Sequence, residues 1–162
     1  MKTLNECVKE YTIELQKGHI QKAYKGIMTF MSSLQRNMIN NHPTYTSSGI
    51  YFGYMDMTYF AFTPLKLKKE HLKIAIVYLH EKNSFEVWLG GNNRKVKLDF
   101  TNQLKQKDLS GFTLSSMEPG VDSIIEAVIT QSPDFDQPEV LMHMIEDETL
   151  KFINRVTALV VE

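Results

Sequence analysis

The sequence predicts an α+β fold, in which helices cover a central, mostly antiparallel sheet of about 4–6 strands. Apolar residues recur at helical spacing near both ends of the chain, whereas the middle holds alternating or continuous apolar runs typical of strands. A short polar turn joins two of these runs, which predicts a hairpin and an antiparallel start to the sheet. We expect an N-terminal helical hairpin, then strands, one mid-chain helix, a further strand and one long C-terminal helix.

The first two elements are predicted to be helices. Thr3 and Glu6 have the spacing of a capping box, and Gly18 is suited to end the helix that follows. A second helix is expected over His19–Asn40, because the residue before Pro43 is driven out of the helical region. The two helices should pack as a hairpin. The apolar stripe of the first helix consists of Leu4, Val8, Tyr11 and Leu15.

Two apolar runs then predict strands. Gly49–Thr63 is rich in Tyr, Phe and Met, which favours a strand that is either unbroken or folded into a hairpin or bulge around Gly53–Asp56. Pro64 should end this element. Leu72–Leu79 is apolar on both faces, which predicts a central strand, and the polar residues His80–Ser84 predict the turn after it.

The second half of the chain alternates strands and helices. Phe85–Leu89 should complete the hairpin, and the two glycines after it should break the strand before a helix that ends near Lys105. Asp108–Gly120 is expected to be a loop with a short strand at Phe112–Leu114. Asp122–Thr130 predicts another buried strand, which could return parallel by a crossover.

The last helix is predicted to begin after Asp136 as its N-cap and to run to about Val160. No repeat or linker interrupts the sequence, so residues 1–162 should form a single globular domain. The net charge of −1 argues against a nucleic-acid binder that is basic all round. The charge is uneven, at +2 over residues 1–64, +6 over 65–107 and −9 over 108–162. These opposite charges either attract within the fold or serve a partner, such as a second copy in a homodimer.

The one cysteine, Cys7, cannot form an internal disulfide. It lies beside Val8 and Tyr11 on the predicted first helix, so we expect it to pack rather than to act as a nucleophile. No apolar run has the length of a signal-peptide core or a membrane span. We therefore expect a cytoplasmic protein without membrane association.

Familiar catalytic and cofactor motifs, such as GxGxxG, GxxxxGK[ST], GxSxG and HExxH, are absent from the sequence. The histidines are scattered, which argues against a structural zinc site, and we expect no cofactor. Three carboxylates flanked by apolar strand residues stand out: Asp56, Glu86 and Glu126. If they converged they could hold Mg²⁺ and form a catalytic centre. The alternative is that each faces solvent or pairs with a basic side chain.

A candidate ligand site lies at the predicted junction between a strand and a helix. Trp88 shares a strand face with Glu86, and the two glycines that follow allow close backbone approach or a positive φ. Free N–H groups at the start of a helix favour an anion. The residues we assign to this site are Asn92, Asn93, Arg94 and Lys95. The alternative is an exposed turn, with Trp88 packed under a helix.

An aromatic and Met-rich cluster that includes Tyr54 and Tyr59 is a second candidate for ligand binding. Tyrosine combines an apolar ring with a hydroxyl, and methionine fills irregular apolar space, so the cluster could line a cleft. The alternative is that it fills the core of the sheet.

Three stretches resemble an uncharacterised family of bacterial proteins of similar length. They are MDMTYFAFTP (Met55–Pro64), LKIAIVYLHEKNSFEVWLGGNNRKV (Leu72–Val96) and the pattern IIEAVI…SPDFD…LKFI (Ile124–Ile153). The resemblance implies a bacterial origin and an unknown function, and it brings no catalytic residue with it.

The order of elements is also similar to that of restriction-endonuclease-like folds. Those sites need an acidic residue on the second core strand and an E-x-K motif on the third. Leu72–Leu79 has no acidic residue, and Glu86-Val87-Trp88 places a tryptophan where the lysine belongs. The sequence therefore favours a non-enzymatic binding domain with an aromatic-lined cleft for a small-molecule or anionic ligand. The alternative is a metal-dependent phosphate or phosphodiester hydrolase of a degenerate restriction-endonuclease-like type.

Overall fold

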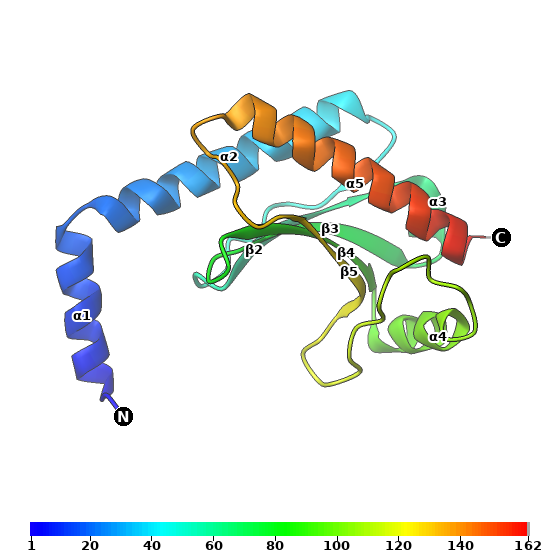
Figure 1. The fold of residues 1–162 in the computed structure, drawn as a ribbon, viewed down its shortest axis with the longest axis horizontal. Helices are drawn as coiled ribbons and strands as arrows, with labels where there is room; N and C mark the ends of the chain where they lie inside the picture. The colour runs from blue at the N-terminus through cyan, green and yellow to red at the C-terminus, as the bar shows by residue number, and fades with distance from the viewer. Residues whose placement is uncertain (162) are drawn as a thin grey trace.

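The computed structural model describes residues 1–161 and has an α+β fold, as predicted. Figure 1 shows the sheet with helices above it and at its ends. The elements are α1 (Leu4–Gln16), α2 (His19–Asn41), β1 (Thr46–Ser47), β2 (Met57–Thr63), α3 (Leu65–Lys69), β3 (Leu72–Leu79), β4 (Ser84–Gly91), α4 (Arg94–Leu104), β5 (Ser123–Thr130) and α5 (Pro138–Val160). The five strands form one sheet in the order β1-β2-β3-β4-β5, and every neighbouring pair is antiparallel.

The hydrophobic core lies between one face of the sheet and the helices α2 and α5, which cover it side by side (Figure 1). Strand residues alternate between the two faces of a sheet, so every second residue points into this core. The fully buried side chains include Phe60 on β2, Ile76 on β3 and Phe85 on β4. Leu34 on α2 and Ile145 on α5 are buried against them. We call the face of the sheet that packs against α2 and α5 the covered face.

β3 is the central strand, and its bounds are those predicted. It pairs with β4 from Leu72 opposite Gly91 to Leu79 opposite Ser84. β4 therefore continues through Gly90 and Gly91 instead of ending before them. Gly91 is required by packing, since a Cβ there would lie 2.8 Å from the backbone nitrogen of Lys97 in α4.

The aromatic segment before β3 folds as a hairpin, which was one of the two alternatives from the sequence. A bridge pairs Tyr51 with Tyr59, and the chain reverses through Gly53 and Met55, which both have positive φ. β2 ends before Pro64, as predicted. The short helix α3 that follows was not predicted.

β5 is an edge strand that runs antiparallel to β4, so the crossover considered from the sequence is not formed. Only its first half is buried, because Val128 is already 54% exposed. The loop before it contributes a single bridge, from Leu114 to Ile125. The prediction of a strand buried along its whole length was therefore wrong.

α5 begins at Pro138 with Gln137 as its N-cap residue, and not with Asp136. The backbone N–H of Asp136 instead donates to the Asp134 carboxylate, which closes the turn before the helix. The buried side of α5 runs from Leu141 to Val160, as the sequence indicates.

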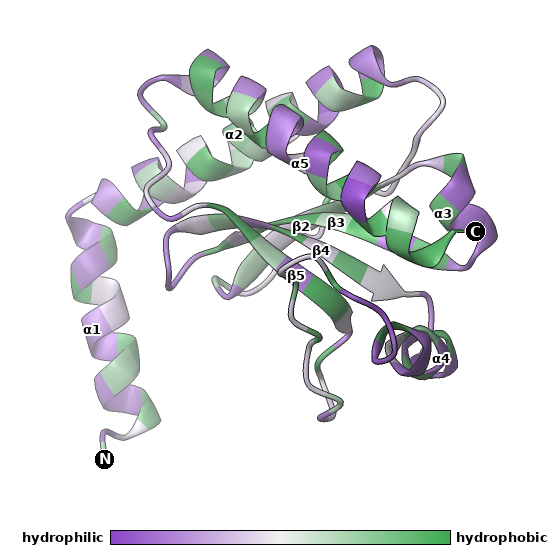
Figure 2. Cartoon of the chain, turned by 45° about the vertical axis from the view of Figure 1, so that its right-hand side comes forward, coloured by the Kyte–Doolittle hydropathy of each residue, from purple (hydrophilic) through white to green (hydrophobic). Residues whose placement is uncertain are grey.

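α1 has the predicted capping box and ends before Gly18, whose φ of 80° is left-handed. The two N-terminal helices are present, but they do not pack as a hairpin. Figures 1 and 2 show α1 projecting away from the sheet, and none of its residues is buried. Cys7 is exposed, so its predicted packing role was wrong. Within residues 1–161 there is no helix with both the length and the apolar character needed to cross a membrane.

Candidate functional site

The face of the sheet opposite α2 and α5 carries a mixed set of side chains, and we call it the open face. Figure 1 shows α4 and the loop before β5 beneath only one end of this face. The register places Ala75 between Ala61 and Trp88, and Trp88 opposite Glu126. These residues are half-buried or exposed, in contrast with the core-facing residues of the same strands.

Three hollows adjoin along the open face. The central hollow has a volume of about 100 Å³, and Tyr59, Lys73, Ala75 and Trp88 are among its lining residues. Trp88 also lines a wider hollow of about 540 Å³ beside the turn before β2, the turn hollow. Lys73 also lines a third hollow of about 180 Å³ at the start of α4, the cationic hollow. Neighbouring hollows share lining residues, and we call the three together the sheet groove.

The size of the side chains explains the central hollow. Ala75 on β3 lies between Ala61 on β2 and Trp88 on β4, and the small alanine side chains leave the floor of the sheet uncovered. Tyr59 and Trp88 stand on the strands on either side of β3 and form apolar walls. A small residue between two aromatic ones thus creates a space in which a flat apolar group fits.

Trp88 is held by a buried acid two residues away. Its indole N–H donates to Oε1 of Glu86 at 3.1 Å, and Glu86 is only 5% exposed. A buried carboxylate needs a donor, and a half-buried indole needs an acceptor, so the bond satisfies both groups. The bond fixes the orientation of the ring that lines two of the hollows. Trp88 lies on the open face, on the side of the sheet opposite α2 and α5.

The cationic hollow contains the basic side chains Lys73, Arg94 and Lys97. Arg94 donates to the carbonyl of Met117 at 3.1 Å. Lys97 is 4% exposed, and its ammonium donates to the carbonyls of Ser116, at 2.7 Å, and Val121. These bonds fasten the loop before β5 to α4.

Burial lowers the pKa of Lys97 below its ordinary value. The charge of Asp122 acts in the opposite direction and raises this pKa, whereas the nearby Arg94 guanidinium lowers it and Glu126 raises it. Asp122 and Glu126 therefore favour the charged form of Lys97, whereas burial and Arg94 disfavour it.

The structure brings most of the predicted ligand residues to this groove. Tyr54 lines the turn hollow, Tyr59 and Trp88 line the central hollow, and Asn92, Asn93 and Arg94 line the cationic hollow. Asn93 is the N-cap of α4 and accepts from the backbone N–H of Val96. Lys95 is exposed and lines none of these hollows, so the structure does not bring it to the groove with the others.

Sequence reasoning missed Lys73 and Lys97. Lys73, Ala75 and Val77 lie on the same face of β3. Only the pairing with β4 shows that this is the face on which Trp88 lies. Lys97 follows Arg94 by three residues, which places both on one side of a helix. That spacing was the available signal for Lys97.

The three carboxylates singled out from the sequence are engaged separately, and Asp56 lies in the turn before β2 rather than on a strand. Asp56 accepts from the backbone N–H of Tyr54 at 2.9 Å, and this bond, with those from Met57 and Asp56 itself, lowers its pKa. Glu86 holds Trp88, and Glu126 accepts from the Ser123 hydroxyl at 2.6 Å. Asp56 and Glu126 both line the turn hollow, whereas Glu86 does not. Within residues 1–161, no set of three or more potential ligand side chains is arranged to hold a metal ion.

Comparison with known proteins identifies a family. The model of a family described as Domain of unknown function (DUF7000) matches residues 4–160, nearly the whole chain. The chain belongs to this family. Neither the curated proteins nor the solved structures gave a match. The family has an unknown function, as the resemblance implied, and the bacterial origin stays a prediction.

In this DUF7000 member the turn that carries Tyr54 is fastened through His80. The Thr58 hydroxyl donates to the carbonyl of Phe52 at 2.7 Å and lies 2.9 Å from Nε2 of His80. The single hydroxyl hydrogen is used by Phe52, so Nε2 of His80 donates to the hydroxyl oxygen. Burial lowers the pKa of His80, and the charge of Asp56 partly raises it.

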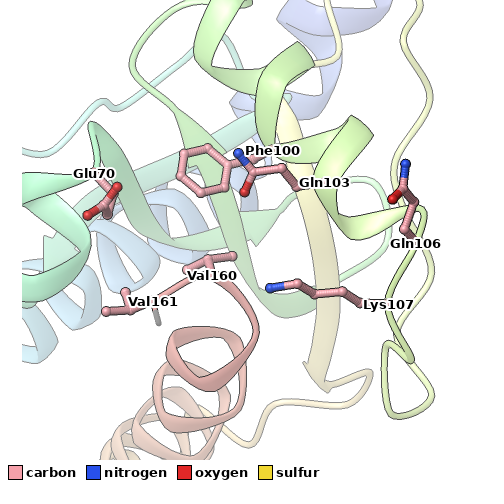
Figure 3. A pocket seen from close by; sticks show the side chains of 7 residues that line it. All are labelled: Glu70, Phe100, Gln103, Gln106, Lys107, Val160 and Val161. Carbon is pink, nitrogen blue, oxygen red and sulfur yellow. The ribbon is translucent and has the colours of Figure 1, made fainter.

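Two further hollows lie outside the sheet groove. One, of about 680 Å³, lies where α4 and α5 end, and Figure 3 shows Phe100 and Gln103 on one side of it and Val160 on the other. Lys107 at its edge donates to the carbonyl of Leu159, which stabilises the last turn of α5. The other, of about 810 Å³, lies between α2 and the start of α5. Among these hollows, the sheet groove alone combines aromatic walls with clustered cations.

Proposed function

We propose that this DUF7000 chain is a non-enzymatic binding domain that takes a small molecule into the sheet groove. A flat apolar part of the ligand lies in the central hollow, between Tyr59 and Trp88. The polar groups along the groove supply orientation, which is how apolar pockets with a few polar contacts achieve specificity.

The observation that carries the proposal is the position of Trp88. Its ring lines two adjoining hollows, and its N–H is already satisfied by Glu86. Tryptophan is enriched at interfaces because it combines a large apolar ring with a polar N–H. Here the ring is fixed in place yet remains half-buried on a sheet face without a covering helix at its centre.

Binding is favoured over catalysis because the three carboxylates that the sequence singled out already have hydrogen-bond partners. Asp56 closes its own turn, Glu86 fixes the indole, and Glu126 accepts from Ser123. Each of these carboxylates has a local structural partner. Such bonds suit a preformed surface that binds a ligand without transforming it.

The test uses the single tryptophan of the chain, because one indole N–H signal in an NMR spectrum then reports on the central hollow. Benzamide, benzoate and phenyl phosphate serve as small aromatic probes. We expect at least one of them to shift the indole signal in a saturable way. If none of the three does so, the proposed function is wrong.

Ala75→Leu is the matching variant, since its side chain fills the central hollow without changing charge. Leucine at this position should weaken probe binding at least tenfold. Val128→Phe is the control, because it adds bulk on the same face at an exposed position that lines none of the hollows. It should bind the probes like the wild-type chain, and unfolding curves will show whether both variants are folded.

The proposal includes self-association through α1. Leu4, Val8 and Tyr11 are 78%, 50% and 55% exposed along one side of this helix. An isolated helix of this length is marginal in water, so a covering surface would stabilise it. A second copy offers the same stripe, and residues 2–17 carry three lysines and three glutamates, so two copies do not repel.

The cytoplasm is the proposed location. The support is Cys7, whose exposed thiol is suited to a reducing compartment. Cell fractionation with an antibody to the chain tests it, and recovery in an oxidising compartment would contradict it.

A further inference from the structure

The cationic hollow has an excess of positive charge. Lys73, Arg94 and Lys97 line it, and Asp122 is the one acidic side chain among its lining residues. The ion pairs found within residues 1–161 include none of the three basic groups. The hollow therefore lies in a positive local field that its own side chains only partly neutralise.

Arg94 and Lys97 are held in place by neutral groups. Their bonds to the carbonyls of Met117, Ser116 and Val121 fix the positions of the two cations. Carbonyl oxygens satisfy hydrogen-bond donors without neutralising their charges, so the charge of Lys97 is offset only in part, by Asp122 and Glu126. Two cations fixed in this way, before any ligand arrives, form a preorganised anion site.

Lys73 lines both the cationic hollow and the central hollow, so it lies where the two meet. It makes no hydrogen bond or ion pair with the other side chains of residues 1–161. Its stem lies over Gly90, where an added Cβ would meet Cε of Lys73 at 3.6 Å. Lys73 pairs with Gly90, and Ala75 pairs with Trp88. Lys73 and Trp88 are therefore diagonal neighbours on adjacent strands, with Cα atoms roughly 7–8 Å apart.

We infer that the ligand of the sheet groove is a flat ring that bears an oxyanion, either a carboxylate or a phosphate monoester. This inference rests on the proposed function. The ring occupies the central hollow against Trp88, and the anionic group occupies the cationic hollow beside Lys73. Both side chains line the central hollow, so a ring held against Trp88 would carry an attached anionic group towards Lys73. The N-terminus of α4, which borders the cationic hollow, adds to the attraction for a negative charge.

The experiment compares four probes of one shape: phenyl phosphate, benzoate, neutral benzamide and cationic benzylamine. Binding is followed through the indole signal of Trp88. The two anions should bind at least tenfold more tightly than benzamide, and benzylamine should bind least. Added salt should weaken the anions and leave benzamide unchanged. A preference for phenyl phosphate over benzoate, or the reverse, identifies which oxyanion the site takes.

Lys73→Gln removes the charge while keeping a polar side chain of similar length. It should abolish the advantage of the anions and leave benzamide binding as it was. Lys95→Gln is the matched control, because it makes the same charge change at an exposed position of α4 outside the hollow. It should retain the preference for anions.

The failures of the two proposals are distinguishable. If benzamide binds as tightly as the anions, or if Lys73→Gln retains the preference, the inference about charge is overturned while the binding function stands. If none of the probes shifts the indole signal, both are overturned.

Discussion

The two faces of the same sheet differ in how completely they are filled. On the covered face, Phe60, Ile76 and Phe85 are fully buried beneath α2 and α5. On the open face, Tyr59 and Trp88 stand beside Ala75, and space remains between them. One face thus maximises packing, whereas the other keeps a hollow with fixed walls. A hollow retained beside half-buried aromatic rings is the pattern expected of a binding surface.

The largest expected effect contrasts one aromatic residue from each face. Phe85→Ala should lower the free energy of unfolding by about 3–5 kcal/mol, because it leaves a cavity among the rings of Phe30, Tyr78 and Phe135. Tyr59→Ala on the open face should cost less than half as much, since its ring is half-buried. Denaturant unfolding measures both. Equal losses would mean that the open face is part of the core.

A smaller effect is expected at the boundary of the open face. Lys97→Met keeps the apolar stem but removes the ammonium that binds two carbonyls of the loop before β5. The free energy of unfolding should fall by about 1–3 kcal/mol. Hydrogen exchange should quicken in residues 115–122, because the loop loses this attachment. Lys95→Met, with the same change at an exposed position, should leave both measurements unchanged.

The fold could be predicted further than the site, for physical reasons. Leu72–Leu79 was recognisable as a central strand because its apolar residues from Ile74 to Tyr78 fall on both faces, although the structure covers only one of these faces with α2 and α5. The site depends on register, since only the pairing of Lys73 with Gly90 places that lysine beside Trp88. Pairing is a long-range property that periodicity does not contain. Arg94 was found because it lies at a recognisable helix start.

The sequence did not predict which apolar stripes are buried. The apolar stripe of α1 predicted packing, but the structure leaves it exposed. A stripe shows that a helix is suited to cover a surface, and it does not identify that surface. The same limit applies to Glu86 and Glu126, whose positions on the strands were visible but whose separate partners were not.

The pH dependence of the free energy of unfolding tests how His80 stabilises the turn before β2, next to the open face. Burial lowers the pKa of His80 in the folded chain, so the unfolded chain binds its proton more readily. The contribution of His80 is complete above its ordinary pKa of about 6.5 and is lost as the pH falls from there towards the lowered value. Denaturant midpoints between pH 8 and pH 5 measure this loss.

His80→Gln isolates this contribution from those of the other histidines. Glutamine keeps a donor for the Thr58 hydroxyl but does not titrate. The midpoint of this variant should fall less steeply with acid than that of the wild-type chain. Curves with the same slope would show that the proton on His80 does not control the turn.

The smallest effect on stability is expected at α1, which belongs to neither face. Leu4→Ser combined with Tyr11→Ser should change the free energy of unfolding of the body by no more than about 0.5 kcal/mol, because neither side chain is buried. Self-association should nevertheless weaken at least tenfold in sedimentation velocity runs over a range of concentrations. A stripe of this size covers less than the roughly 800 Å² per partner of a standard interface, so the proposed dimer of the wild-type chain should itself dissociate on dilution. If the double variant associates like the wild type, copies of the chain meet elsewhere, and the exposed stripe serves another partner.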